Sequence, residues 1–187
     1  MSNNITDIAS FKPQEKDAFI FDTNVLIKVF YPVMGAVNST RYINLYNLIH
    51  EAKSKVYISS IQISEFVNRC IRFQFGIYSD EHPEIKDFKK DYRETTDYKE
   101  NMDAILQIVR EDILLKFERI NDNFDNMDLD NLFMNSFSYD FNDAFIAELS
   151  RKYKTILVTD DKDYINFLNK LDIVTNNKAI LMFKSRK

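Results

Sequence analysis

Acidic side chains follow two short apolar runs of the sequence. Asp22 comes directly after the run at residues 18–21, and Asp160 and Asp161 follow the run at 155–159. Each run is short, apolar and bounded by polar residues, which predicts a buried strand. Ligands of open parallel sheets bind beyond the carboxyl ends of the strands. We therefore expect these carboxylates at one functional edge of a sheet.

Two further acids lie near the starts of expected helices. Glu65 lies in the first half of a helix expected from Ile61 to about Phe75, which Ser59 or Ser60 would cap. Asp143 lies near the start of a helix expected from Ser138 or Tyr139 to about Tyr153. Clustered carboxylates repel one another and resist ionisation, and a hard divalent cation bound through oxygen relieves that repulsion. The pattern predicts an Mg²⁺ or Mn²⁺ site.

Each of these acids also has an ordinary structural explanation. Asp22 could cap the helix that Thr23 begins, and Asp161 could cap the short helix after it. Glu65 could be a solvated charge on an amphipathic helix, and Asp143 could be a first-turn charge favoured by the helix dipole. The functional interpretation depends on all four acids meeting in one place.

Strands and helices alternate along the chain, which predicts an α/β fold with a central, mainly parallel β-sheet flanked by α-helices. The length of 187 residues predicts a single domain spanning residues 1–187. A charged segment at about 79–130 is expected to form a helical insertion or lid within it. The expected strands are 18–21, 56–59, 155–158, 171–174 and 179–183, and the expected helices are 23–31, 40–52, 61–75, 97–117, 138–153 and 162–168.

Composition excludes some classes of function and leaves others open. With only two glycines, Gly35 and Gly76, the chain has neither a Walker phosphate loop nor a GxGxxG dinucleotide fingerprint. The lone Cys70 cannot form an intramolecular disulfide, and no charged start with an apolar run opens the chain, so we expect a cytoplasmic protein without a membrane anchor. The net charge of −4 argues only weakly against a nucleic-acid partner, because carboxylates that hold cations contribute to it.

Three segments together resemble the sequence blocks of PIN-domain nucleases, in the usual order of that family. They are FDTNVLI at 21–27, SSIQISEF at 59–66 and FNDAFIAELSRKYKTILVTDDKDY at 141–164. The resemblance covers most of residues 17–175. It implies a PIN-like fold, and it assigns the catalytic and metal-binding acids to Asp22, Glu65, Asp143 and Asp161, a further metal ligand to Asp163, and supporting roles to Asn24 and Thr159. Asp140 and Asp160 are additional acids beside this set.

The resemblance implies a metal-dependent endoribonuclease such as a VapC-type toxin of a toxin-antitoxin pair. RNA would be the substrate, with an antitoxin or other protein partner and a homodimer as further expectations. One or two ions can activate water and neutralise the leaving oxygen without a histidine. Two alternatives stay open. One is a PIN-like nucleic-acid or protein binding module without turnover, and the other is a haloacid-dehalogenase-like phosphatase, although its second acid would fall on Asn24.

Overall fold

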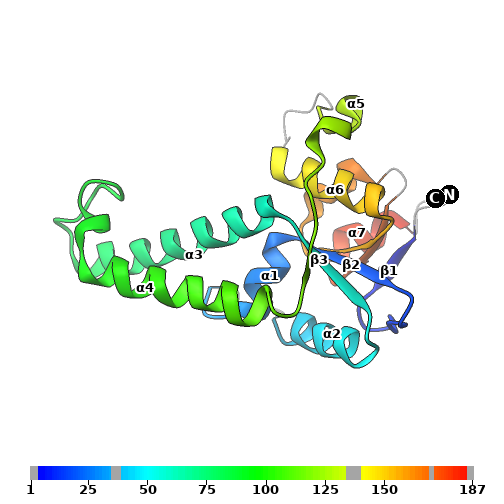
Figure 1. Ribbon diagram of the computed structural model, residues 1–187, viewed down its shortest axis with the longest axis horizontal. Helices are drawn as coiled ribbons and strands as arrows, with labels where there is room; N and C mark the ends of the chain where they lie inside the picture. Colours follow the sequence, from blue (N-terminus) through cyan, green and yellow to red (C-terminus); the bar gives the residue numbers. More distant parts are fainter. Residues whose placement is uncertain (1–3, 35–38, 134–139, 169–170, 185–187) are drawn as a thin grey trace.

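A parallel β-sheet forms the centre of the protein (Figure 1). The computed structural model describes residues 4–34, 39–133, 140–168 and 171–184. Within these residues six strands form one sheet in the order β1-β6-β5-β2-β3-β4, and every neighbouring pair is parallel. The mainly parallel sheet expected from the sequence is thus confirmed. The strands are β1 (Ile5–Asp7), β2 (Ala18–Phe21), β3 (Lys55–Ile58), β4 (Glu118–Arg119), β5 (Ile156–Val158) and β6 (Asp172–Thr175).

Helices cover both faces of this sheet. Side chains of a strand alternate between faces, so Phe19 and Phe21 of β2 belong to one apolar cluster and Ile20 belongs to the other. The first cluster is completed by α1 (Thr23–Phe30), α2 (Ser39–Glu51), α3 (Ser60–Glu81), α4 (Thr96–Gln107) and the π-helix η2 (Ile108–Ile113). The second is completed by α5 (Leu129–Leu132), α6 (Phe141–Tyr153), the 3₁₀-helix η4 (Lys162–Phe167) and α7 (Lys178–Lys184).

The paired helices α3 and α4 extend away from the sheet as an arm (Figure 1). The arm has its own aromatic packing, centred on Tyr92, which lies in the 3₁₀-helix η1 (Tyr92–Glu94) and is fully buried. The Tyr92 ring contacts Phe75, Tyr78 and Tyr98, and its hydroxyl donates to Asp97 at 2.7 Å. The division of the chain into a core and an inserted lid at about 79–130 stays a prediction.

The prediction of a strand at 179–183 is wrong. This segment forms α7, because the Asn177 side chain accepts hydrogen bonds from the backbone N–H groups of Ala179 and Ile180, at 2.9 and 3.4 Å, and so begins a helix. Ile180 is buried while Met182 is 60% exposed, so the apolar run is a one-sided helix and not a strand buried on both faces.

Two short strands escaped prediction, and two of the expected helices differ markedly from their predicted bounds. β1 and β4 contain only three and two residues, too few for an alternating pattern. The expected helix 61–75 continues to Glu81 as α3, and the expected helix 97–117 changes at Ile108 into η2. The start expected at Ser138 or Tyr139 lies outside the described residues. No helix in the described part of the chain is long and apolar enough to cross a membrane.

Candidate active site

Asp22 and Thr159 follow the adjacent strands β2 and β5 at the carboxyl edge of the sheet. The backbone N–H of Asp22 donates to the carbonyl of Val158 at 2.9 Å, which fixes the ends of the two strands side by side. The Thr159 hydroxyl then donates to Asp22 Oδ2 at 3.0 Å. Both residues are buried, with Asp22 only 2% exposed. A buried carboxylate in this position is held in one orientation by its partners.

Asp22 occupies the N-cap position of α1, yet its side chain makes no capping hydrogen bond. Its carboxylate instead accepts from Thr159 and, at 3.4 Å, from the buried hydroxyl of Tyr164 on η4. The alternative that Asp22 serves as a helix cap does not account for where its oxygens point. The carboxylate is directed toward β5 and η4.

Glu65 is positioned by the start of α3. Ser59 and Gln62 form a capping box there, and Gln62 Nε2 donates to the carbonyl of Phe21 at 2.6 Å, which ties α3 to the end of β2. The Glu65 carboxylate accepts from the Thr23 hydroxyl at 2.9 Å and from Asn142 Nδ2 at 3.2 Å. Glu65 therefore links α3 to the turn after β2 and to the first turn of α6.

The Asp161 carboxylate accepts hydrogen bonds from two elements, α1 and η4. Asn24 Nδ2 donates to Asp161 Oδ2 at 3.0 Å, and the backbone N–H of Asp163 donates to Asp161 Oδ1 at 3.0 Å, so Asp161 also caps η4. Its own backbone N–H donates to Thr159 Oγ1 at 2.9 Å. One threonine hydroxyl thus contacts both Asp22 and the backbone of Asp161. Asn24 and Thr159 each donate to a carboxylate of the predicted set, and the supporting roles expected for them stay predictions.

Asp143 lies in the first turn of α6, which Asp140 caps by accepting from the N–H groups of Asn142 and Asp143 at 2.8 and 3.4 Å. Burial raises the pKa of Asp143 from 3.8 to about 8, and the nearby negative charges add to the rise. In decreasing order of effect these charges are Asp22, Asp140, Asp161 and Glu65. Asp143 is therefore an electrostatic neighbour of the other three predicted acids.

Burial likewise raises the pKa of Asp22 from 3.8 to about 7. The hydrogen bond from Thr159 opposes the rise, the charges of Glu65 and Asp161 add to it, and the positive charge of Arg69 lowers it. Asp22, Glu65, Asp143 and Asp161, hereafter the acidic centre, come from four separate elements and meet at one edge of the sheet.

The other three acids named from the sequence have different surroundings. Asp140 caps α6 and adds its charge to the field at Asp143. Asp163 is half-buried on η4, and its backbone N–H contacts Asp161. Asp160 pairs with Lys28 and accepts from the Tyr42 hydroxyl at 2.9 Å. The carboxylates of Asp160 and Asp161 therefore have different partners.

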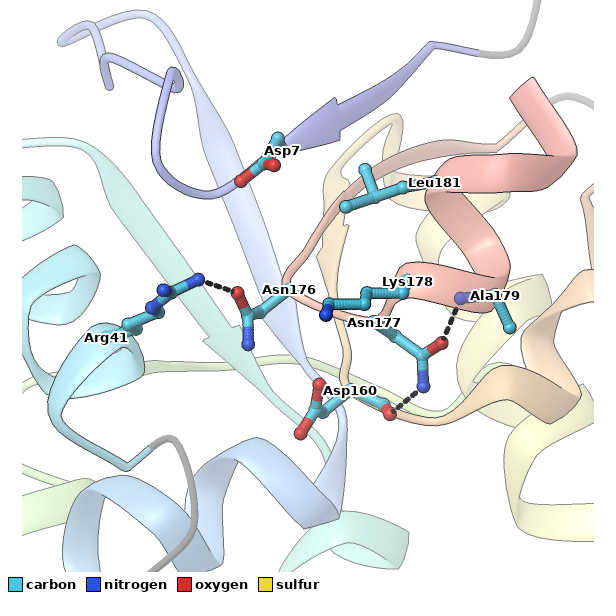
Figure 2. Close-up of a pocket in the computed structure, with 8 residues that line it drawn as sticks. All are labelled: Asp7, Arg41, Asp160, Asn176, Asn177, Lys178, Ala179 and Leu181. Atoms are coloured by element: carbon cyan, nitrogen blue, oxygen red, sulfur yellow. Dashed lines mark hydrogen bonds between the residues drawn. The ribbon is translucent and has the colours of Figure 1, made fainter. Parts of the chain in front are cut away.

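Asp160 faces a separate polar hollow of about 580 Å³ beside the acidic centre. Figure 2 shows Arg41 of α2 and Lys178 of α7 directed toward this hollow from opposite sides. Arg41 donates to Asn176, and Asn177 Nδ2 donates to the carbonyl of Asp160 at 2.8 Å. The hollow lies beyond the carboxyl ends of β1, β5 and β6.

Four contributors to the acidic centre were not assigned from the sequence. Thr23 and Asn142 donate to Glu65, and Tyr164 donates to Asp22. Arg69 lies one helical turn after Glu65, with Nη1 at 3.5 Å from Glu65 Oε1. The i,i+4 spacing of Glu65 and Arg69 was the one available sequence signal for a shared helix face. The partners of Tyr164 and Asn142 depend on tertiary contacts.

The chemistry of the acidic centre suits a hard divalent cation, because all of its charged groups are carboxylates. Burial, together with the repulsion between these carboxylates, raises the pKa of Asp22 and of Asp143. As placed, no three His, Cys, Asp or Glu side chains within the described residues form a ready metal cage. The carboxylate oxygens accept hydrogen bonds instead: Glu65 accepts from Thr23 and Asn142, and Asp161 accepts from Asn24. Binding an ion would exchange some of these hydrogen bonds for metal bonds.

Comparison with known families shows which family the chain belongs to. The family model described as PIN domain matches residues 19–170. The chain belongs to the PIN-domain family. This match contains all four members of the acidic centre and sets aside the phosphatase alternative.

A solved structure supports the PIN fold. The chain resembles the crystal structure of VapBC2 from Rickettsia felis bound to a DNA fragment from their promoter, with 17% sequence identity and a TM-score of 0.51. The alignment covers 84% of this chain and 98% of the other. No curated protein sequence matches the chain. PIN domains are generally nucleases.

Proposed function

We propose that this PIN domain is a metal-dependent endoribonuclease that hydrolyses RNA phosphodiester bonds. The observation that carries the proposal is the convergence of Asp22, Glu65, Asp143 and Asp161 at the carboxyl edge of the sheet, where burial and mutual repulsion raise the pKa of Asp22 to about 7 and of Asp143 to about 8. Four carboxylates so placed are poorly accommodated without cations.

The acidic centre would hold Mg²⁺ or Mn²⁺, with Asp163 as a fifth candidate ligand two residues after Asp161. A bound divalent ion supplies an activated water and charge neutralisation at the phosphate. The protein's own contribution is orientation. Thr159 fixes Asp22, and Asn24 fixes Asp161. Removing a residue that hydrogen-bonds to a metal ligand commonly lowers metal affinity or activity by roughly 10- to 100-fold.

A toxin-antitoxin role is the biological setting that we propose for this activity. The structural neighbour from Rickettsia felis is a VapBC complex. By analogy, the chain would act in the cytoplasm and be restrained by an antitoxin protein, and it would assemble as a homodimer.

Cleavage of a mixed pool of structured and single-stranded RNA tests the proposal. The wild type is compared with Asp22→Asn and Asp143→Asn in Mn²⁺, Mg²⁺ or EDTA, and circular dichroism checks that each variant is folded. We expect metal-dependent cutting by the wild type, with at least a 100-fold loss in both variants, roughly the upper end of what losing an outer-shell partner costs.

The same assay separates the alternatives. An absence of cutting together with an absence of divalent-ion binding in calorimetry would contradict the nuclease and favour a binding module. Unchanged cutting by Asp22→Asn would place the active site elsewhere. Cleavage of single-stranded DNA in preference to RNA would contradict the assignment of substrate.

A further inference from the structure

Arg69 brings a positive charge to the rim of the acidic centre. It lies on α3, one helical turn after Glu65, and its Nη1 donates to Asn24 Oδ1 at 2.7 Å. The same nitrogen lies 3.5 Å from Glu65 Oε1. The charge of Arg69 reaches Asp22 as well, where it lowers the pKa of the buried carboxyl. This arginine therefore faces the proposed reaction site and not only its helix neighbour.

Its contacts do not use up the binding capacity of the guanidinium. Within the described part of the chain, the contacts with Asn24 and Glu65 both come from Nη1. A guanidinium carries five N–H donors in a planar fork, which matches the geometry of a phosphate. The Arg69 side chain is 38% exposed, so the fork is reachable from solvent while it touches the acidic centre.

A purely structural explanation accounts poorly for this placement. An i,i+4 ion pair on a partly exposed helix face stabilises a protein by only about 0.3–0.5 kcal/mol. The shortest contact of Arg69 goes to the neutral amide of Asn24, whose own N–H₂ group donates to Asp161. Lys28, the cation on the neighbouring helix α1, is instead paired with Asp160.

We propose that Arg69 is a substrate-binding residue that donates a forked pair of hydrogen bonds to a backbone phosphate of the RNA at the acidic centre. The inference rests on the proposed nuclease function. A cluster of carboxylates repels the phosphodiester that it must act on, and a cation at its rim offsets that repulsion. Arginine suits this role because it stays charged and binds phosphate through two donors.

The competing explanation is that Arg69 only positions Asn24 and Glu65. The two roles differ in their effect on metal binding. If Arg69 orders the carboxylates, its loss weakens divalent-ion binding. If it serves the phosphate, its loss removes a competing cation from Glu65 and leaves ion affinity unchanged or higher.

The variants for the test are Arg69→Gln and Arg69→Lys, with Arg72→Gln as a matched control. Arg72 lies on the same helix and loses the same charge, but its guanidinium packs over the Phe88 ring of the arm at 4.7 Å. Each substitution is made in the Asp143→Asn background, so that RNA stays intact. The probe is a fluorescein-labelled, mixed-sequence single-stranded RNA, whose affinity is measured by anisotropy in Mg²⁺ from about 50 to 200 mM salt.

We expect Arg69→Gln to weaken RNA binding about tenfold or more, as loss of a charged hydrogen bond does. The slope of log affinity against log salt should become shallower by about 0.7, the value for one phosphate contact on a single strand. Arg69→Lys should keep the slope of the Asp143→Asn parent and recover part of the affinity, because lysine retains the charge but not the fork. Arg72→Gln should change affinity by less than about twofold.

Calorimetry with Mn²⁺ on Arg69→Gln, made in the otherwise wild-type chain, completes the test. A weaker ion affinity would overturn the inference in favour of a positioning role. RNA affinity and salt slope equal to those of Arg72→Gln would also overturn it, while RNA cleavage by the wild type would leave the proposed function standing. No RNA cleavage by the wild type with either ion would overturn the proposed function and this inference together.

Discussion

The Thr159 hydroxyl donates to Asp22 Oδ2 at 3.0 Å, joining two residues that are 137 positions apart in the chain. The same oxygen accepts the backbone N–H of Asp161 at 2.9 Å. Because Thr159 is fully buried, water cannot replace either bond. One hydroxyl therefore sets the relative positions of two acids of the centre.

Replacing this hydroxyl should weaken the metal site. Thr159→Val keeps the side-chain shape but leaves the Asp161 N–H without its acceptor and Asp22 Oδ2 without its donor. We expect about 1–3 kcal/mol of destabilisation and a 10- to 100-fold loss of Mn²⁺ affinity by calorimetry, to an order of magnitude.

Thr155→Val is the control for that experiment. Thr155 is also buried and contacts the Ser150 hydroxyl at 2.9 Å, but it precedes β5, whereas Thr159 follows it. It should lose stability while keeping Mn²⁺ affinity. Equal ion affinities in the two variants would show that the Thr159 hydroxyl is only structural.

The metal-free protein should lose stability as the pH rises. The pKa of Asp22 is raised from 3.8 to about 7 and that of Asp143 to about 8, so the folded state holds these protons more tightly than the unfolded chain. Their contribution is complete below pH 3.8 and is lost as the pH rises through about 7 to 8. Melting in EDTA between pH 5 and pH 9, by calorimetry, measures the change.

Asp143→Asn should reduce this dependence. Without a buried carboxyl to ionise, the variant should melt higher than the wild type in EDTA at high pH, by about 2–4 °C for each kcal/mol that burial and repulsion of the ionised Asp143 cost the wild type. Mn²⁺ should stabilise the wild type more at high pH than at low pH, since the ion binds deprotonated carboxylates. A wild-type melting temperature in EDTA that rises from pH 5 to pH 9 would contradict the assignment of raised pKa values.

The neighbouring acids Asp160 and Asp161 should respond differently to the same substitution. Asp160 pairs with Lys28, and both side chains are about 15% exposed, so Asp160→Asn leaves a largely buried lysine without its carboxylate. We expect Asp160→Asn to lose about 1–3 kcal/mol of stability in urea unfolding but to keep Mn²⁺ affinity. Asp161→Asn should weaken Mn²⁺ binding, with a smaller effect on stability. The reverse pattern would move Asp160 into the metal site.

The sequence predicted which acids lie at the carboxyl edge of the sheet better than it predicted the hydrogen bonds that these acids make. The apolar runs before Asp22 and Asp160 are long enough to identify β2 and β5, and alternating strands and helices require a parallel sheet. That argument brings acids of different elements to one edge. It does not determine which oxygen meets which donor, and Asp22, a plausible helix cap, is held by Thr159 and Tyr164 instead.

Local chemistry explains the main errors of the sequence analysis. The run after Asn177 has the apolar content of a strand, but the Asn177 side chain caps it as α7. The two-residue β4 exists because it pairs with β3, and no local pattern announces it. Arg69 is one of several scattered basic residues in the sequence, and only the fold places it against Asn24.

A final prediction concerns the amide of Asn24. Asn24 Nδ2 donates to Asp161 at 3.0 Å, so Asn24→Asp would replace a donor by a carboxylate facing another carboxylate. The variant should be less stable than the wild type in EDTA at pH 8, by about 1–2 kcal/mol, because the two carboxylates repel each other. Mn²⁺ should restore more stability to it than to the wild type. Asn68→Asp adds the same charge to the exposed side of α3 and should show neither effect; equal melting curves for the two variants would mean that Asn24 does not support Asp161.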